Sequence, residues 1–111
     1  MKIQKNTVMN IPLENFVYWA AGRGRECNLT EKYIAQLYVN QKGLCAISGL
    51  PLDESVMSLD RKNSNKDYIK GNVQWVHVMV NRMKSNFAEK DFIKMCVVIS
   101  KYKNKKYAIQ K

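Results

Sequence analysis

Three residues in the middle of the chain carry side chains that can serve a hard cation. Asp60 ends the stretch SVMSLD, Asn72 precedes VQW, and Asn81 lies in VHVMVNRMK. Magnesium takes oxygen ligands and keeps several waters, so one carboxylate and one side-chain amide suit its demands. Phosphodiester cleavage uses such an ion near the leaving oxygen, together with a base for the attacking water. These residues therefore predict a Mg²⁺ or Mn²⁺ site for phosphodiester hydrolysis.

The charge balance favours a polyanionic partner. Nineteen Lys and Arg against nine Asp and Glu give a formal net charge of +10, and the pI is near 9.7. A surplus of this size attracts polyanions through counterion release, and nucleic acid is the commonest such partner. The alternative is an ordinary basic protein from a Lys/Asn-rich genome.

Length and composition predict one small intracellular domain. The 111 residues contain no signal peptide and no apolar run approaching about 18 residues. We therefore expect a cytoplasmic protein with no membrane partner. Cys27, Cys45 and Cys96 are too few and too widely spaced for a disulfide framework, so we expect free thiols, with Cys96 in the core.

The elements that must position these residues predict an α+β fold that is mainly helical. The segment 12–21 has apolar residues at helical spacing, and 28–43 reads as a second helix, capped by Asn28 and ended by Gly43. The buried positions expected in these two helices are Leu13, Phe16, Val17, Ala20, Ile34, Leu37 and Tyr38.

After Gly43 the pattern changes to a hairpin followed by helices. We expect a strand over 55–62, a polar loop, a short return strand over 73–75, a helix over 76–84 and a last helix over 88–102. The single domain 1–111 then divides into N-terminal helices (1–43), a hairpin-and-helix core (44–86), and a C-terminal helix with a basic tail (87–111).

Residues 45–84, CAISGLPLDESVMSLDRKNSNKDYIKGNVQWVHVMVNRMK, resemble the HNH endonuclease family. The similarity is greatest to short phage and bacterial members with the pattern SLDR…GNVQWV…VN.MK. A looser match, including GRG, LT and QKGLCAISG, runs from about residue 22 to the last helix. The resemblance implies a ββα-metal fold, in which a two-stranded hairpin and a helix hold one divalent ion. It also implies a DNA endonuclease in a phage or mobile-element setting, acting in a bacterial host.

The resemblance assigns roles one position at a time. Asp60 matches the aspartate that binds the metal, and Asn81 matches the helix residue that supplies the second ligand. Asn72 matches the asparagine that ties the loop to the hairpin and so positions the base. Arg82 and Lys84 follow on the helix, where the family places charges that contact phosphates.

One departure from the family concerns a structural zinc. Many members carry two CxxC pairs, but the matching positions here are Cys45 with Ser48 and His77 with Val80. This set cannot close a four-ligand zinc site. We therefore expect no structural zinc and apolar packing in its place, by Ile47, Leu50, Val76 and Val80.

The second departure concerns the general base. Arg61 follows Asp60 where the family has its base, and a guanidinium stays protonated, so it can only contact phosphate or stabilise negative charge. His77 is the only histidine and precedes Asn81 by four residues, so on a helix the two share a face. Three accounts remain open. His77 is the base, or metal-bound hydroxide attacks while Arg61 clamps the phosphate and a less obvious group takes the proton, or the site is degenerate.

Further basic residues are candidates for DNA contact. Arg23 and Arg25 follow the first helix, and the tail carries Lys101, Lys103, Lys105 and Lys106. The functions that compete with an endonuclease are a DNA-binding module that no longer cuts and an accessory component of a phage packaging or recombination assembly. One site of this kind cuts one strand, so the sequence leaves both a monomer and a homodimer open.

Overall fold

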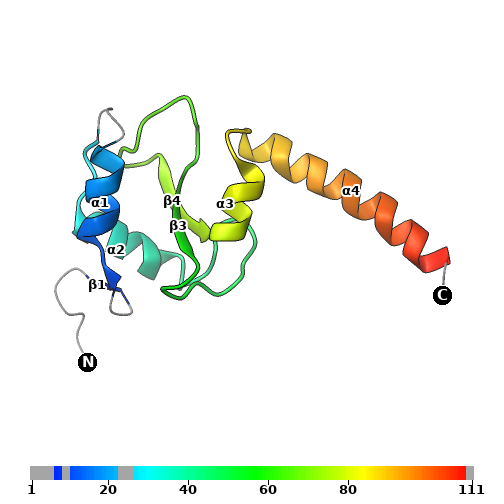
Figure 1. Cartoon of the computed structure of the whole chain (residues 1–111), viewed down its shortest axis with the longest axis horizontal. Helices are drawn as coiled ribbons and strands as arrows, with labels where there is room; N and C mark the ends of the chain where they lie inside the picture. Colours follow the sequence, from blue (N-terminus) through cyan, green and yellow to red (C-terminus); the bar gives the residue numbers. More distant parts are fainter. Residues whose placement is uncertain (1–6, 9–10, 23–26, 110–111) are drawn as a thin grey trace.

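The computed structural model describes residues 7–8, 11–22 and 27–109 and confirms the α+β class. Within these ranges the chain forms four helices and two small antiparallel sheets (Figure 1). The elements are β1 (Thr7–Val8), β2 (Ile11–Pro12), α1 (Glu14–Ala21), α2 (Glu31–Asn40), β3 (Met57–Arg61), β4 (Val73–His77), α3 (Val78–Lys84) and α4 (Glu89–Ile109). Arg23 and Arg25 lie outside the described residues.

The two N-terminal helices form where their periodicity predicted them, but the second has a different cap. Thr30 is the N-cap of α2, and its Oγ1 accepts a hydrogen bond from the Tyr33 backbone N–H at 3.1 Å. Asn28 instead accepts from the backbone N–H of Lys70 at 2.7 Å. The prediction that Asn28 caps α2 is therefore wrong, and its side chain ties this segment to the hairpin loop.

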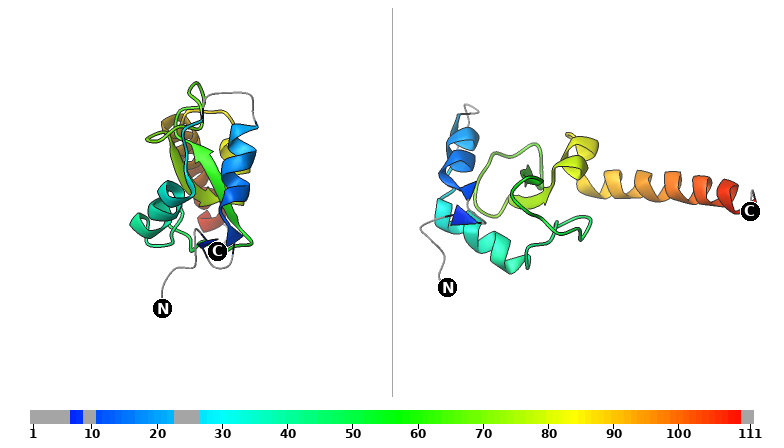
Figure 2. Two further views of the ribbon diagram at one scale, coloured as in Figure 1. Left: turned by 90° about the vertical axis from the view of Figure 1, so that its left-hand side faces the viewer. Right: turned by 60° about the horizontal axis from the view of Figure 1, so that its bottom comes forward.

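The core lies between the β3–β4 hairpin and helices α1 and α2. Trp75 on β4 is fully buried, and its indole Nε1 donates to the Ile34 carbonyl at 2.8 Å. Phe16 of α1 meets the Trp75 ring edge-on, with 4.9 Å between centroids. Figures 1 and 2 show α1 and α2 on one side of the hairpin, with α3 and α4 on the other. Trp75 thus joins both N-terminal helices to the hairpin.

The register of the hairpin decides which polar residues meet. β3 and β4 pair antiparallel with Asp60 opposite Gln74 and Met57 opposite His77. β4 is longer than the predicted strand because Val76 and His77 continue the pairing. As a result α3 begins at Val78 rather than at residue 76.

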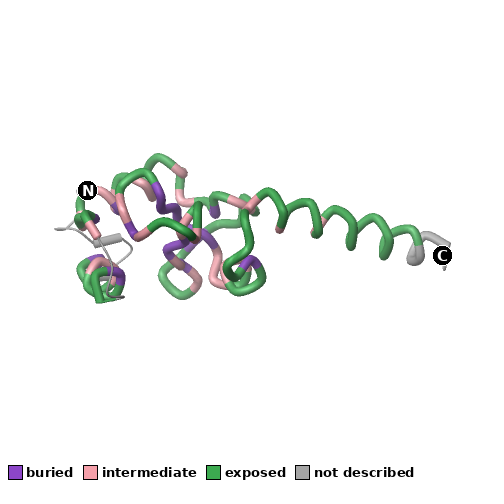
Figure 3. The backbone as a smooth tube through the Cα atoms, turned by 90° about the horizontal axis from the view of Figure 1, so that it is seen from above, coloured by how far each residue is buried: buried purple, intermediate pink, exposed green. Residues whose placement is uncertain are grey.

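Helix α4 extends away from the rest of the molecule, as Figures 1 and 3 show. Its 21 residues carry exposed large apolar side chains at Ile93, Met95, Val97, Val98, Ile99 and Tyr102. Cys96 is half-buried and lies outside the core cluster, so the prediction that it is a core residue is wrong. The described helices include none that combines the length and apolarity needed to cross a bilayer.

Candidate functional site

A polar pocket forms where the hairpin meets α3. Asp60 and Arg61 reach it from the end of β3, and Asn81 reaches it from α3. Its volume is about 170 Å³. The other lining residues are Trp19, Leu59, Ser64, Tyr68, Ser85 and Asn86. The structure therefore brings both predicted metal ligands and the predicted phosphate clamp into one pocket.

Asp60 belongs to a polar group that we call the Asp60 cluster, which consists of buried Asp60, Gln74 and Lys84 and half-buried Glu89. Asp60 is only 4% exposed; its Oδ1 lies 3.2 Å from the Lys84 ammonium, and its Oδ2 accepts from Gln74 Nε2 at 3.0 Å. Gln74 Nε2 also donates to Glu89 Oε1 at 3.0 Å. Throughout the described residues, every buried side-chain nitrogen and oxygen has a hydrogen-bond partner. The Asp60 cluster is thus fully satisfied and fixes the orientation of the carboxylate.

Lys84 and Arg82 differ in where they lie. Lys84 is 1% exposed and donates to the Arg61 carbonyl at 3.3 Å in addition to its pairing with Asp60. Its ammonium is therefore not at the surface, contrary to the expected contact with phosphate. Arg82 is exposed on α3 and does not line the pocket. It stays a candidate for contact with DNA outside the pocket.

The oxygens that Asp60 and Asn81 offer fit a hard, well-hydrated ion. A carboxylate has about four lone-pair sites, and two at Asp60 are used by Lys84 and Gln74. Asn81 donates its amide nitrogen to Ser58 Oγ at 2.6 Å, which leaves its carbonyl oxygen for a cation. In the described part of the chain, no three His, Cys, Asp or Glu side chains form a metal-binding group. The oxygens of Asp60 and Asn81 therefore fit a Mg²⁺ or Mn²⁺ ion that keeps most of its waters.

Arg61 is held against the wall of the pocket by two contacts. Its Nη1 donates to the Lys66 carbonyl at 3.1 Å, and its guanidinium carbon lies 5.1 Å from the centre of the Tyr68 ring. Tyr68 is buried and meets Trp19 edge-on at 5.2 Å, as expected of a packing residue. Because a guanidinium has five N–H donors, Arg61 keeps donors available for an anion in the pocket.

Asn72 ties the long loop of the hairpin to β4. Its Oδ1 accepts from the Asn63 N–H at 3.0 Å, and its Nδ2 donates to the carbonyls of Asn63 at 3.1 Å and Asp67 at 2.9 Å. These are the hydrogen bonds that the resemblance to HNH proteins predicts for this residue. Asn72 does not line the pocket, and its side-chain hydrogen bonds are all made to the loop.

We expect Asn72→Ala to lower the free energy of unfolding by about 2–4 kcal/mol, because three loop groups lose their partner at once. Urea denaturation followed by tryptophan fluorescence measures the change. Asn65→Ala is the matched control, since Asn65 is exposed in the same loop and its backbone N–H, which remains, makes the bond to Asn63. Equal midpoints for the two variants would contradict this role of Asn72.

His77 lies at the junction of β4 and α3 instead of inside the helix. It is the N-cap of α3, and its Nδ1 accepts from the Met79 backbone N–H at 3.1 Å. It does not line the pocket with Asp60 and Asn81. The prediction that His77 shares a helix face with Asn81 is therefore wrong, because the strand runs two residues further than its pattern indicated.

The positions matching the zinc ligands of HNH proteins contain a buried thiol. Cys45 Sγ accepts from the backbone N–H groups of Ser48 and His77, both at 3.3 Å. Burial raises the pKa of this thiol, but the hydrogen bonds from Ser48, His77 and Ile47 outweigh it, so the pKa lies below its ordinary value. The absence of a structural zinc stays a prediction.

The apolar packing expected around Cys45 is present in part. Val76 is fully buried, and Ile47 and Val80 pack against the core. Leu50 is 49% exposed, so its predicted packing is wrong. Pro51 pairs with Leu44 in an isolated bridge, so the chain doubles back at this point and Leu50 lies on the outside of the turn.

One basic surface was missed by treating the C-terminal lysines as a tail. Helix α4 continues through them, and Lys90, Lys94, Lys101 and Lys105 are exposed at spacings that place them on one helical face. Gln74 and Glu89 of the Asp60 cluster were also missed. The available signals were the helical spacing of the lysines and the single polar residue in the strand VQWV.

No protein-family model matches the chain. The chain is similar to an uncharacterized 29.0 kDa protein in the dda-modA intergenic region of Enterobacteria phage T4. The two are 34% identical over 99 residues, which cover 84% of this chain and 39% of the phage protein. The chain thus spans about two fifths of the length of that relative.

Proposed function

We propose that the chain is a divalent-metal-dependent DNA endonuclease of the HNH type that hydrolyses phosphodiester bonds. The observation that carries this proposal is the convergence of Asp60, Arg61 and Asn81 on one polar pocket between a hairpin and the following helix. Asp60 and Asn81 would hold the ion through their oxygens. When bound there, Mg²⁺ would supply positive charge beside the leaving oxygen and favour deprotonation of the attacking water.

The residues around the ligands orient the reacting groups. Lys84 and Gln74 each bind one oxygen of Asp60, so the carboxylate cannot rotate away from the pocket. Arg61 binds the scissile phosphate with the N–H groups that Lys66 does not use. Because this guanidinium stays protonated, it stabilises the negative charge that develops on the phosphate and takes no proton.

The affinity for DNA comes from basic residues outside the pocket. The chain has a net charge of +10, and the exposed lysine face of α4 and Arg82 on α3 contribute to it. Such contacts to phosphates are independent of sequence and weaken with salt. The phage origin of the similar protein is consistent with a phage-encoded enzyme that acts inside a bacterial host.

The position of His77 favours the account in which Arg61 clamps the phosphate and His77 is not the base. We expect His77→Asn, which keeps an acceptor for the α3 cap, to cleave DNA at a rate within about threefold of the wild-type rate. Loss of a true base would instead lower the rate by about 10²–10⁴. His77→Ala should cleave equally well and lose about 1 kcal/mol of stability. Initial nicking rates at saturating Mg²⁺ test this. A loss of at least 100-fold in both variants would restore His77 as the base.

A DNA-binding module that no longer cuts is the second candidate. The Lys84 ammonium lies 3.2 Å from Asp60 Oδ1, and a positive charge at this place competes with a metal ion for the carboxylate. In a protein of this fold that has lost catalysis, the Asp60–Lys84 pair would serve only to stabilise the fold. The buried ion pair is therefore the observation that favours the second candidate over the first.

Plasmid cleavage and salt-dependent binding separate the candidates. Nicking in Mg²⁺ or Mn²⁺ that stops in EDTA supports the endonuclease. Tight binding without cleavage in any metal supports the module. Each phosphate contact contributes about −0.9 to the slope of log K against log salt on duplex DNA, so we expect a steep negative slope in both cases. A slope near zero together with no cleavage would exclude both the endonuclease and the DNA-binding module. The accessory role in a phage assembly would then be the remaining candidate function.

A further inference from the structure

Helix α4 carries an apolar seam whose side chains are exposed, apart from half-buried Phe92. Phe92, Met95, Ile99 and Tyr102 follow one another at spacings of three, four and three residues, which places them on one helical face. Met95 is 57% exposed and Ile99 is 56% exposed. Monomeric proteins rarely leave contiguous apolar surfaces of this kind open to water. The seam therefore requires an occupant.

Beside the seam lies a groove of about 580 Å³ between α4 and the preceding turn. Its lining residues are Met83, Phe87, Asp91, Phe92, Met95, Cys96 and Ile99. Phe87 and Met83 are themselves largely exposed, so they widen the apolar surface next to the N-terminal half of α4. An occupant of the seam must therefore be an elongated apolar element that also covers Phe87.

We propose that the occupant is a second copy of this chain, whose α4 packs antiparallel against the first around a two-fold axis near Val97. In this register Met95 faces Ile99 of the second copy, and Phe92 faces Tyr102 of the second copy. Both pairs are matched by the same axis, so the seam is complementary to itself, as an isologous interface requires. The C-terminal half of the second helix then lies along the groove and covers Phe87.

The charges that flank the seam select the antiparallel orientation. The first turn of α4 is acidic, with Glu89 and Asp91, and the exposed C-terminal half carries Lys103 and Lys105. Around the axis near Val97, Asp91 comes opposite Lys105 of the second copy on one flank, and Glu89 comes opposite Lys103 on the other. A parallel pair would instead bring the basic halves together, which costs affinity.

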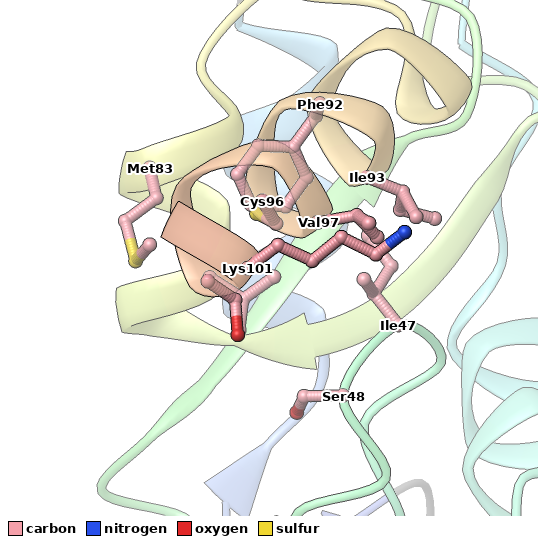
Figure 4. Close-up of a pocket in the computed structure, with 10 residues that line it drawn as sticks. Ile47, Ser48, Met83, Phe92, Ile93, Cys96, Val97 and Lys101 are labelled. Atoms are coloured by element: carbon pink, nitrogen blue, oxygen red, sulfur yellow. The ribbon is translucent and has the colours of Figure 1, made fainter. Parts of the chain in front are cut away.

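The other side of α4 is less suited to a second helix. There Ile93 and Val97 face Ile47 across an apolar pocket of about 480 Å³, and the Lys101 side chain extends beside Val97 towards Ile93 (Figure 4). The ammonium of Lys101 thus stands at the edge of that pocket. The seam of Met95 and Ile99 has no lysine within its lining. Of the lysine face, Lys105 lies on the flank of the pair, whereas Lys90, Lys94 and Lys101 stay outside it and remain accessible to DNA.

The mass of the chain in solution tests the pairing without reference to catalysis. Sedimentation equilibrium at about 5–100 µM should give a mass near twice the 12.9 kDa of one chain. Ile99→Glu should give a monomer with unchanged helix content by circular dichroism, because glutamate is at least as good a helix former as isoleucine. Lys94→Glu, which changes a charge outside the seam, should stay dimeric. A wild-type monomer at every concentration would overturn the proposal.

Charge reversal tests the orientation. Asp91→Lys and Lys105→Asp should each raise the dissociation constant of the dimer by about tenfold, because each puts like charges opposite each other on one flank. The double variant Asp91→Lys/Lys105→Asp should return to within about threefold of wild type. That restoration is expected only for the antiparallel pair. A double variant that dissociates further than either single one would overturn the proposed register.

Discussion

We expect Asp60→Asn to abolish the proposed metal-dependent nicking, while the affinity for DNA should stay within about threefold of wild type. A bound metal ion contributes several kcal/mol to stabilising the transition state, and 1.4 kcal/mol is tenfold in rate, so we expect a loss of at least about 10²-fold. We expect the affinity for DNA to come from the lysine face of α4 and from Arg82, which lie outside the pocket. Initial rates on supercoiled plasmid and a binding titration at the same salt concentration measure both quantities.

The single variant needs a control for folding, because it leaves the Lys84 ammonium buried beside a neutral amide. In Asp60→Asn/Lys84→Met both members of the ion pair become neutral, and burial of an apolar chain replaces burial of a charge. This double variant should fold as well as wild type and remain unable to nick. Glu54→Gln, which neutralises an exposed carboxylate in the turn before β3, should nick at the wild-type rate. Nicking by the double variant at the wild-type rate would exclude Asp60 as a metal ligand.

The local elements of this fold were predictable because each has its own pattern. The helical spacing of Leu13 and Ala20 and the alternation around Leu59 reflect burial on one face, and all three residues are buried. The site residues Asp60 and Asn81 were predictable because their chemistry is carried by residue type and by the resemblance to HNH proteins. Their convergence in one pocket follows from a hairpin and a helix that are close in sequence.

The features that were not predictable depend on contacts between distant segments. Whether His77 ends a strand or begins a helix is decided by its pairing with Met57, twenty residues earlier in the chain. Asn28 has the residue type of a cap, yet its oxygen binds the backbone of Lys70 in the hairpin loop. The burial of Lys84 depends on Asp60 across the hairpin–helix junction. No local pattern distinguishes a buried lysine from the exposed lysines on either side of it.

We expect Lys84→Met to lower the free energy of unfolding by about 3–5 kcal/mol, because it leaves the Asp60 carboxylate buried without its counter-charge. The carboxylate keeps its bond from Gln74 but loses the ammonium at 3.2 Å. Adding Asp60→Asn to this variant should recover most of the loss, since no unpaired charge remains. Urea denaturation in EDTA measures the three free energies, and a loss under about 1 kcal/mol for Lys84→Met would show that the pair is unimportant to the fold.

The same variant reports on the metal without any DNA. If Mg²⁺ binds at Asp60, it replaces the missing positive charge, and the stability of Lys84→Met rises with Mg²⁺ concentration. The gain is about 1.4 kcal/mol when the free ion is at ten times its dissociation constant. Asp60→Asn/Lys84→Met should show no such gain, because the carboxylate is gone. Equal responses of the two variants to Mg²⁺ would show that the ion binds elsewhere. The pocket would then hold only an anion, through Arg61. The DNA-binding module would be the better account of this fold.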